Sequence, residues 1–497
     1  MKLLKTLTIT TALLVSAQVG GAMFAEAAKK DITLGVALEP PHLDPTAGAA
    51  AAIDEIVYAN VFEGLTRISS TGEVKPALAE SWSISDDGKV YTFKLRTGVK
   101  FHDGTAFDAE DVKFSLDRAR GEDSTNAQKG LFKAIESVEV VDPATVKISL
   151  SSPAGNFLFN MGWGDAIIVA PESADGNKAN PVGTGPFKFS KWAKGSSVEL
   201  TKNDGYWGDA IALDKATFRF IPDAAAAVSA LLAGDVDGFP NFPAPEQVPQ
   251  IQADPRFTVV IGSTEGETIL STNNKKPPFD NIKVRQAVAH AIDREAIING
   301  AMFGQGTPIG THFAPHHPAY VDLIGTYPMD IDKAKALLAE AGYPDGFKAT
   351  IKLPPPTYAR RGGEIVAASL RKIGIELEII PVEWAQWLDQ VFKKKDYDLT
   401  IVSHTEPQDI GIYARDTYYF QYDSAAFKAV MEKLNAETDT QKRYALMAEA
   451  QKIITGDAVN GYLFQLAKTG VWNAKIKGLW ENAPVQANDL TGVSWTD

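Results

Sequence analysis

A short polar loop, Ser403–Asp409, carries side chains well suited to binding a charged group. It follows the apolar segment Tyr397–Ser403, which we expect to form a buried strand. In open α/β sheets, ligands bind just beyond the carboxyl ends of the strands. Glu406 or Asp409 is therefore expected to hold a cationic group, with His404 beside them. The alternative is that this loop is only solvated.

Two consecutive arginines, Arg360 and Arg361, form the second candidate. They stand at the start of a predicted helix, Arg360–Ile373, soon after the predicted strand Lys348–Leu353. The helix dipole slightly disfavours cations at a helix N-terminus, so a pair of arginines there needs another reason. We expect one of the two to contact a ligand, and the sequence does not choose between them. The alternative is that both are solvated.

Two tryptophans, Trp384 and Trp387, lie one helical turn apart and adjoin Leu388. An aromatic pair at this spacing is more typical of a core than of a ligand platform. Trp384 is kept as a candidate for a ligand contact.

Three histidines, His312, His316 and His317, suggest a metal site. They lie in a Pro-rich loop rather than on a helix face, and no further ligand residues are clustered with them in the sequence. We therefore predict no metal site and no cofactor.

Catalysis is also disfavoured by the sequence. His102 and Asp103 are adjacent, so in a strand their side chains point to opposite faces and cannot form a dyad. The chain has no cysteine and lacks the Gly-x-Ser-x-Gly and His-Glu-x-x-His motifs. An exported hydrolase on an α/β scaffold is the alternative, and we predict that the protein is not an enzyme.

The segment Thr268–Arg294 organises the elements that position these residues. Thr268–Leu270 is apolar and suits a buried strand, and the two prolines that follow break regular structure. Asp280 is the predicted N-cap of a long amphipathic helix whose apolar positions recur from Ile282 to Ile292. Beyond it, strands and helices alternate, which predicts an α/β lobe with a mostly parallel sheet. In the first half we expect a strand at Asp31–Leu38, a helix at Ile53–Gly64 and glycine-dependent turns in Pro181–Phe187.

Composition limits the class of protein. A chain of 497 residues is long enough for two or three domains. Its net charge of −13 disfavours binding to nucleic acid or anionic membranes. Residues 1–27 combine Lys2 and Lys5, an apolar stretch and a small-x-small site, which predicts a cleaved signal peptide. Because cysteine is absent, we expect neither disulfides nor a lipid anchor.

Several blocks of sequence carry a family resemblance. In the second half these are Asn273, Pro278–Asp280, Val284–Ala287 and Ala291–Arg294. In the first half they are Glu63–Leu65, Phe101–Gly104, Ala109–Val112, Val182–Pro186 and Asn203–Gly208. In type and order they resemble the family 5 bacterial solute-binding proteins, the dipeptide-, oligopeptide-, nickel- and opine-binding group of ABC importers.

The resemblance implies a two-lobed α/β periplasmic-binding-protein (Venus-flytrap) fold with mixed sheets. The first lobe would span residues 28–266 and carry an extra subdomain at about 59–180. The second lobe would span 267–470, and residues 471–497 would return to the first lobe. It also implies a monomer in the periplasm, neither lipidated nor inserted in the membrane. This protein would deliver a peptide-like solute to permease subunits served by cytoplasmic ATPases.

The resemblance also implies roles for the candidate residues. In dipeptide-binding members an arginine pair stands at the place of Arg360 and Arg361, and an arginine of the second lobe holds the ligand carboxylate. An acidic side chain of the loop containing Glu406 and Asp409 accepts the ligand amine. Here His404–Pro407 replaces the aromatic and small residues common in the family, which argues against an ordinary dipeptide.

In the first lobe, Asp44 and Trp163 are the residues expected to face the cleft. A ligand consisting of nickel or another metal chelate, and a chaperone-like role in holding unfolded peptides, remain alternatives.

Overall fold

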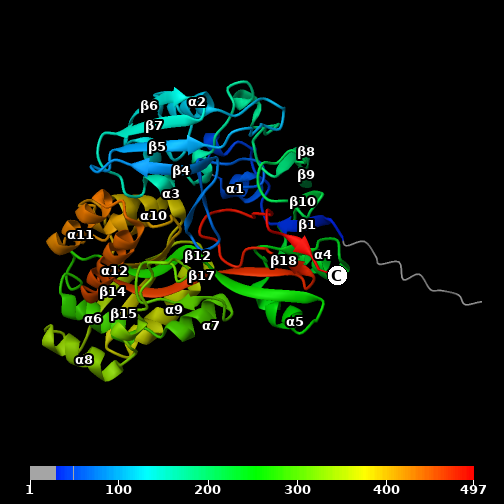
Figure 1. Ribbon diagram of the computed structural model, residues 1–497. Helices are drawn as coiled ribbons and strands as arrows, with labels where there is room; N and C mark the ends of the chain where they lie inside the picture. The colour runs from blue at the N-terminus through cyan, green and yellow to red at the C-terminus, as the bar shows by residue number, and fades with distance from the viewer. Residues whose placement is uncertain (1–28, 49, 497) are drawn as a thin grey trace, which may run out of the picture.

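The computed structural model describes residues 29–48 and 50–496. The predicted signal peptide, residues 1–27, lies outside the described residues. The chain forms two lobes of mixed α/β structure joined by two long strands (Figure 1). Within the described part of the chain, no helix combines the length and the apolar character needed to cross a membrane.

One large mixed sheet runs through both lobes. Counting the described residues only, it has 11 strands in the order β15-β14-β16-β12-β17-β11-β1-β10-β9-β8, with β13 beside β17. The strands are β1 (Asp31–Val36), β8 (Phe187–Ala193), β9 (Ser197–Lys202), β10 (Lys215–Phe220), β11 (Gly238–Phe239), β12 (Phe257–Thr272), β13 (Thr307–Pro308), β14 (Phe347–Leu353), β15 (Ile375–Pro381), β16 (Leu399–His404) and β17 (Asn460–Asn473).

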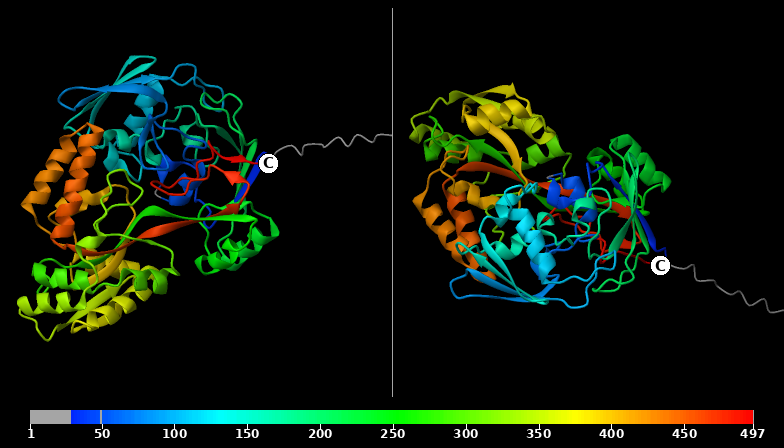
Figure 2. Two further views of the ribbon diagram at one scale, coloured as in Figure 1. Left: turned by 60° about the horizontal axis from the view of Figure 1, so that its bottom comes forward. Right: turned by 90° about the horizontal axis from the view of Figure 1, so that it is seen from above.

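The two long strands β12 and β17, here called the connecting ribbon, are antiparallel and run side by side between the lobes (Figure 2). At one end the ribbon pairs with β11 of the first lobe, and at the other end with β16 of the second. The register of the ribbon shifts at two places: between Ser263 and Glu267, where residues 264–266 interrupt the pairing, and between Thr268 and Ile269. This interruption lies where the ribbon passes from one lobe to the other.

An additional layer of the first lobe packs around its own core. A four-stranded sheet, β4-β5-β7-β6, is covered by a helix whose N-cap is Asp108. Phe93, Leu116 and Ile148 belong to the buried cluster between the two. The elements here are β2 (Thr66–Ile68), β3 (Val74–Pro76), β4 (Ala79–Ile84), β5 (Val90–Leu95), α2 (Ala109–Arg120), β6 (Ile135–Asp142), β7 (Thr145–Leu150) and α3 (Phe157–Asn160).

The remaining helices surround the large sheet. In the second lobe, α6, α7, α8 and α9 pack around the core that contains Leu270, Ile351 and Leu370. The bounds are α1 (Ala51–Val57), α4 (Ala224–Ala233), α5 (Val248–Gln252), α6 (Ile282–Ala291), α7 (Arg294–Met302), α8 (Ile331–Glu340), α9 (Thr357–Arg371), α10 (Trp384–Trp387), α11 (Ala425–Ala436) and α12 (Thr440–Gly456). The C-terminal strands are β18 (Ile476–Lys477) and β19 (Ser494–Trp495).

The helix expected over Ile282–Ile292 is found as α6, which ends at Ala291, but its N-cap is not Asp280. The N-cap of α6 is Asn281, whose side chain accepts a hydrogen bond from the backbone N–H of Lys283. Ile292 is extended, and the Asp293 side chain then caps α7. A second good N-cap just after the amphipathic run therefore starts a further helix, α7, which was not predicted from the sequence.

Three other expectations also need correction. The helix predicted at Ile53–Gly64 ends at Val57, before the left-handed residue Ala59. The sheet of the second lobe is parallel only through β15-β14-β16, because β12 and β17 are antiparallel to their neighbours. Gly183 and Gly185 are required for close packing rather than for turns, since a Cβ atom there would lie 2.0 Å from Val61 O and 2.5 Å from Asn60 O.

Candidate functional site

A cavity of about 500 Å³ lies where the first lobe meets the connecting ribbon. A volume of this size is in the range of small-molecule sites. Its walls come from the end of β1, the start of α1, residues 264–266 of β12, residues 466–468 of β17 and the C-terminal segment 483–488. Thr405, from the loop after β16, adds a contribution from the second lobe. The cavity is thus bounded by both lobes and by the segment that joins them.

Two groups of opposite charge line this cavity, the buried Lys468 and the half-buried Glu55. Lys468 lies in β17, and its Nζ donates a hydrogen bond to Trp480 O (2.5 Å). Burial lowers the pKa of Lys468 to about 8, and the nearby Glu55 opposes this shift. Burial raises the pKa of Glu55, and Lys468 in turn opposes it. A cation and a carboxylate in one cavity suit a ligand that carries both charges.

The interruption of the ribbon is held by a histidine. His316 Nε2 is hydrogen-bonded to Glu265 Oε1 (2.6 Å), and His316 Nδ1 to Ser263 Oγ (2.7 Å). Burial raises the pKa of Glu265, and the bond from His316 offsets part of that rise. The loop that contains His316 therefore fastens the point at which the ribbon changes register.

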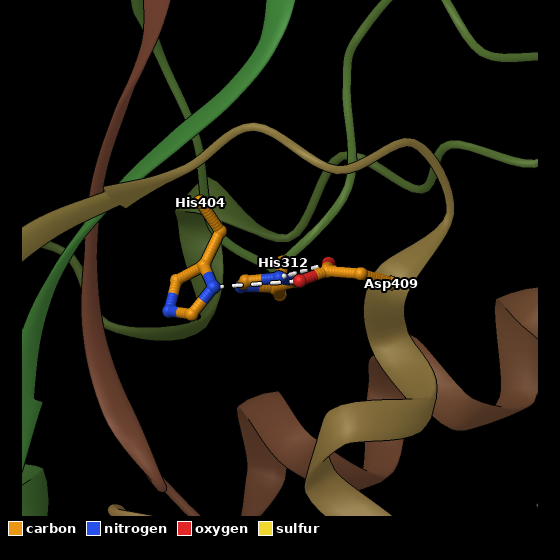
Figure 3. Close-up of side chains that lie close together, drawn as sticks. All are labelled: His312, His404 and Asp409. Atoms are coloured by element: carbon orange, nitrogen blue, oxygen red, sulfur yellow. Dashed lines mark hydrogen bonds and ion pairs between the residues drawn. The ribbon is translucent and has the colours of Figure 1, made fainter. Parts of the chain in front are cut away.

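A second cluster lies beyond the ribbon in the second lobe (Figure 3). Asp409 accepts a hydrogen bond from His312 Nε2 (2.7 Å), and its other oxygen lies 3.4 Å from His404 Nδ1. Burial would raise the pKa of Asp409, but the two imidazoles outweigh it and lower that pKa. Burial lowers the pKa of His312, with Asp409 opposing.

Glu267 lies directly opposite His404 in the register of β12 and β16 and is 3% exposed. Among the described residues, its Oε2 has no hydrogen-bond partner. Burial, together with the carboxylates of Glu265 and Asp409, raises the pKa of Glu267 well above its ordinary value.

Residues 73–426 match the model of the bacterial extracellular solute-binding proteins, family 5. The chain belongs to this family. Its two-lobed architecture, with a cavity between lobe and ribbon, is the family's architecture, so the fold expected from the resemblance is confirmed.

Curated relatives of this solute-binding protein support the assignment. Heme-binding protein A of Haemophilus influenzae is 32% identical over 433 residues, which are 78% of each chain. Glutathione-binding protein GsiB of Salmonella paratyphi A is 34% identical over 372 residues, covering 73% of this chain and 72% of that protein. Among solved structures, the periplasmic binding protein DppA of Helicobacter pylori in complex with the peptide STSA is 30% identical. It covers 95% of this chain and 99% of that one, with a TM-score of 0.74.

The two arginines of this solute-binding protein point in different directions. Arg360 Nη2 donates to Glu383 Oε1 (3.0 Å), and the Arg360 side chain is half-buried. Arg361 is exposed and lies over the ring of Phe303 in α7, 5.6 Å from its centroid. Because α9 begins at Thr357, both arginines lie within its first turns, as expected.

The aromatic and acidic candidate residues differ in burial and in their position relative to the cavity. Trp387 is buried and donates from Nε1 to Thr400 Oγ1 (2.9 Å), whereas Trp384 is 41% exposed. Trp163 is half-buried and joins the cluster containing Val485, which lines the cavity. Glu406 is exposed, on the loop beside the cavity residue Thr405.

Asp44 serves a local structural role. It is fully buried, and its carboxylate accepts hydrogen bonds from the backbone N–H (2.9 Å) and the hydroxyl (2.6 Å) of Thr46. Arg118 lies 3.7 Å away as its ion-pair partner.

A pair of carboxylates lies nearby. Asp165 is buried and Asp54 is half-buried, and within the described chain one buried oxygen of each has no hydrogen-bond partner. Burial raises the pKa of Asp165 to about 7, and burial with the Asp165 charge raises that of Asp54.

The sequence interpretation missed the charged residues of the cavity. Glu55, Glu265 and Lys468 line it, whereas none of the eight predicted site residues does. The sequence did contain a signal for this site. Glu265 and Lys468 are charged residues within the long strands β12 and β17, and charged residues are rarely buried unless they have a partner. His404 and Asp409, which are distant from His312 in the sequence, lie beside it in the fold.

Proposed function

We propose that this protein captures a peptide or peptide-like solute and presents it to an ABC importer. The observation that carries the proposal is the cavity between lobe and ribbon, which is lined by a buried ammonium group, Lys468, a buried carboxyl group, Glu265, and a half-buried one, Glu55. A peptide, an opine or another amino-acid conjugate carries charges of both signs. Buried charges are costly unless they are paired, so such a ligand would stabilise these groups.

The predicted site residues extend this pocket in the proposal. A ligand carboxylate would meet Arg360 or Arg361, which offer planar bidentate pairing. A ligand amine would bind Glu406, the exposed carboxylate of the loop. Alternatively it would bind Asp409, in place of one of the histidines that now contact this carboxylate. Trp384 and Trp163 would supply apolar contact area, while Asp44 would fix the loop that begins at residue 44.

We further propose that the lobes close on the solute by bending at residues 264–266. The division proposed is a first lobe of residues 28–266 with an inserted subdomain at 59–180. A second lobe of residues 267–470 and a C-terminal return at 471–497 complete it. Closure around a ligand is the usual means by which two-lobed binding proteins combine affinity with recognition by a partner.

The partners in this proposal are two permease subunits in the inner membrane and their cytoplasmic ATPases. The mature chain would act as an unlipidated monomer in the periplasm and would not catalyse a reaction. Relatives whose names specify glutathione, dipeptides and heme define the ligand classes to test.

The test is mass spectrometry of small molecules released by denaturing protein purified from its native periplasm. Calorimetry with the released compound and with glutathione, heme and short peptides then ranks them. A released peptide or amino-acid conjugate that binds with 1:1 stoichiometry is expected. If the released solute contains neither an amine nor a carboxylate, the peptide-like assignment is wrong.

A further inference from the structure

Two imidazoles and one carboxylate converge in the second lobe from three separate segments. His312 lies in the loop after β13, His404 ends β16, and Asp409 begins the 3-10 helix Asp409–Ala414. One ligand atom from each can be chosen so that all lie within 4.8 Å of one another. Figure 3 shows the imidazole edges of His312 and His404 directed at the carboxylate.

The far nitrogen of each ring is held by a tyrosine hydroxyl. His312 Nδ1 is 3.1 Å from Tyr413 Oη, and His404 Nε2 is 3.0 Å from Tyr419 Oη. Tyr413 is itself fixed by a hydrogen bond from Asn460 Nδ2 (3.0 Å). Metal-bound histidines almost always have such an outer partner, which fixes the tautomer and aims the other nitrogen at the metal.

A second carboxylate is available on the same face. Glu267 is directly opposite His404 across β12 and β16, and directly opposed side chains have Cβ atoms about 5 Å apart. Glu267 is almost fully buried, and among the described residues nothing bonds its Oε2. Such an oxygen is expected to have a partner, and a cation would provide one.

We infer that His312, His404 and Asp409 form a binding site for a divalent transition-metal ion, with Glu267 as a fourth ligand or counter-charge. Two neutral imidazoles and two carboxylates balance the charge of one such ion. Imidazole donors favour zinc and its neighbours over magnesium and calcium, which prefer oxygen-only sites. On binding, each imidazole carries its proton on the nitrogen that faces its tyrosine, and that N–H donates a hydrogen bond to the tyrosine hydroxyl.

This inference goes beyond the proposed function, because capture of a peptide-like solute requires no metal. The site lies in one lobe at the ribbon, so a bound ion would stabilise the same strand, β12, that carries the interruption at residues 264–266.

The test uses the full mature chain, stripped with EDTA and then freed of chelator. Zn²⁺ is titrated by calorimetry without added solute, and Co²⁺ is used to read the coordination by its visible absorption. One equivalent of Zn²⁺ is expected, with a rise in melting temperature because the ion binds only the native state. His404→Gln and Asp409→Asn should each weaken binding by more than ~10-fold, and Tyr413→Phe by ~10-fold, the loss typical of an outer partner.

His42→Gln, in the first lobe, is the matched control and should bind Zn²⁺ as the parent does. Tyr413→Phe retains the ring, so it tests the site even if the ligand variants fail to fold. Absence of a Co²⁺ band, or equal Zn²⁺ affinity in parent and variants, would overturn the assignment. The assignment is also wrong if methylamine raises the melting temperature of stripped protein and Zn²⁺ does not. Since no solute is present, these outcomes are independent of whether a peptide is the captured ligand.

Discussion

The hydroxyl of Tyr358 accepts a hydrogen bond from the backbone N–H of Ser403 (3.3 Å), which ties the first turn of α9 to the end of β16. The arginines at 360–361 and the loop of Glu406 therefore belong to neighbouring ends of two elements, although more than 40 residues separate them in the chain. This adjacency makes it feasible for one lobe to hold both ends of a zwitterionic ligand before closure.

The first prediction concerns the arginines. Replacing the one that contacts the ligand by Ala leaves a carboxylate unpaired in a closed cleft, at a cost of about 2–5 kcal/mol. Calorimetry on Arg360→Ala and Arg361→Ala should show a loss of affinity of ~30-fold or more in one of them. Arg→Lys at that position should retain only part of the ligand affinity, since an ammonium group cannot form the bidentate pair with a carboxylate.

Arg371→Ala is the control for this series, because Arg371 lies in the last turn of the same helix and is exposed. Its affinity should match that of the parent. Unchanged binding in both Arg360→Ala and Arg361→Ala would exclude the arginine pair from the pocket.

The second prediction uses the pH dependence of Lys468. Burial lowers the pKa of this residue to about 8, so a ligand carboxylate held by it should lose affinity as pH rises through about 8. Arginine does not titrate in this range. Affinity measured from pH 6 to 9 therefore distinguishes Lys468 from Arg360 and Arg361, and Lys468→Met should abolish the pH dependence. A flat profile in the parent would assign the carboxylate elsewhere.

Stability gives an independent check on Lys468. The unfolded side chain keeps its proton to about 10.5, whereas the folded one releases it near 8. The folded state is thus penalised below about pH 8, and the penalty disappears as pH rises toward 10.5. In urea unfolding, the free energy of unfolding of the parent should therefore rise from pH 8 toward 10.5 relative to that of Lys468→Met, which lacks the titrating ammonium group.

The third prediction concerns the buried acid Asp165. Burial raises its pKa to about 7, from an ordinary value of 3.8. An acid whose folded pKa is raised destabilises the fold above its unfolded pKa, so stability should fall between about pH 4 and 7. Asp165→Asn removes this cost and should stabilise the protein at pH 8 by roughly 2–4 kcal/mol, with little effect at pH 4. Melting curves across this range decide it, and equal gains at both pH values would contradict the explanation.

The fourth prediction concerns a close contact between the inserted sheet and the helical pair α11–α12. The backbone N–H of Gly155 donates to Asn435 O (2.8 Å), and a Cβ at Gly155 would lie 2.1 Å from Glu437 O. Gly155→Ala should therefore destabilise the protein by ~1–3 kcal/mol in urea unfolding. Gly130→Ala is the control, because its Cβ would meet nothing within 4 Å. If Gly155→Ala and Gly130→Ala have similar free energies of unfolding, the contact at Gly155 tolerates a Cβ atom and the prediction is wrong.

Several helices and strands could be predicted because they depend on residues that are close together in the sequence. The strand predicted at Lys348–Leu353 and the helix predicted at Arg360–Ile373 are found as β14 and α9, because the apolar periodicity of each segment is a local property of the sequence. Helix α7 was not predicted, although the Asp293 side chain caps it. Helix α11 was not predicted at all, although Ser424 caps it.

The candidate site was less predictable, since distances between segments are set by the whole sheet. His312 and Asp409 are 97 residues apart and meet only because the loop after β13 lies beside the end of β16. Lys468 and Glu55 approach each other because β17 crosses from one lobe to the other. Neither of these two contacts could be predicted from the position of a residue along its own strand.

The interruption at residues 264–266 determines how the molecule can deform. On both sides of it the ribbon is hydrogen-bonded to a third strand, β11 or β16, so each half is braced against bending. If the lobes close by bending at these three residues, as proposed, displacement would grow with distance from them, smallest at Glu265 and largest at the lobe tips. A solute seated beside this segment would move little during closure, while the outer surfaces that meet a membrane partner would move most.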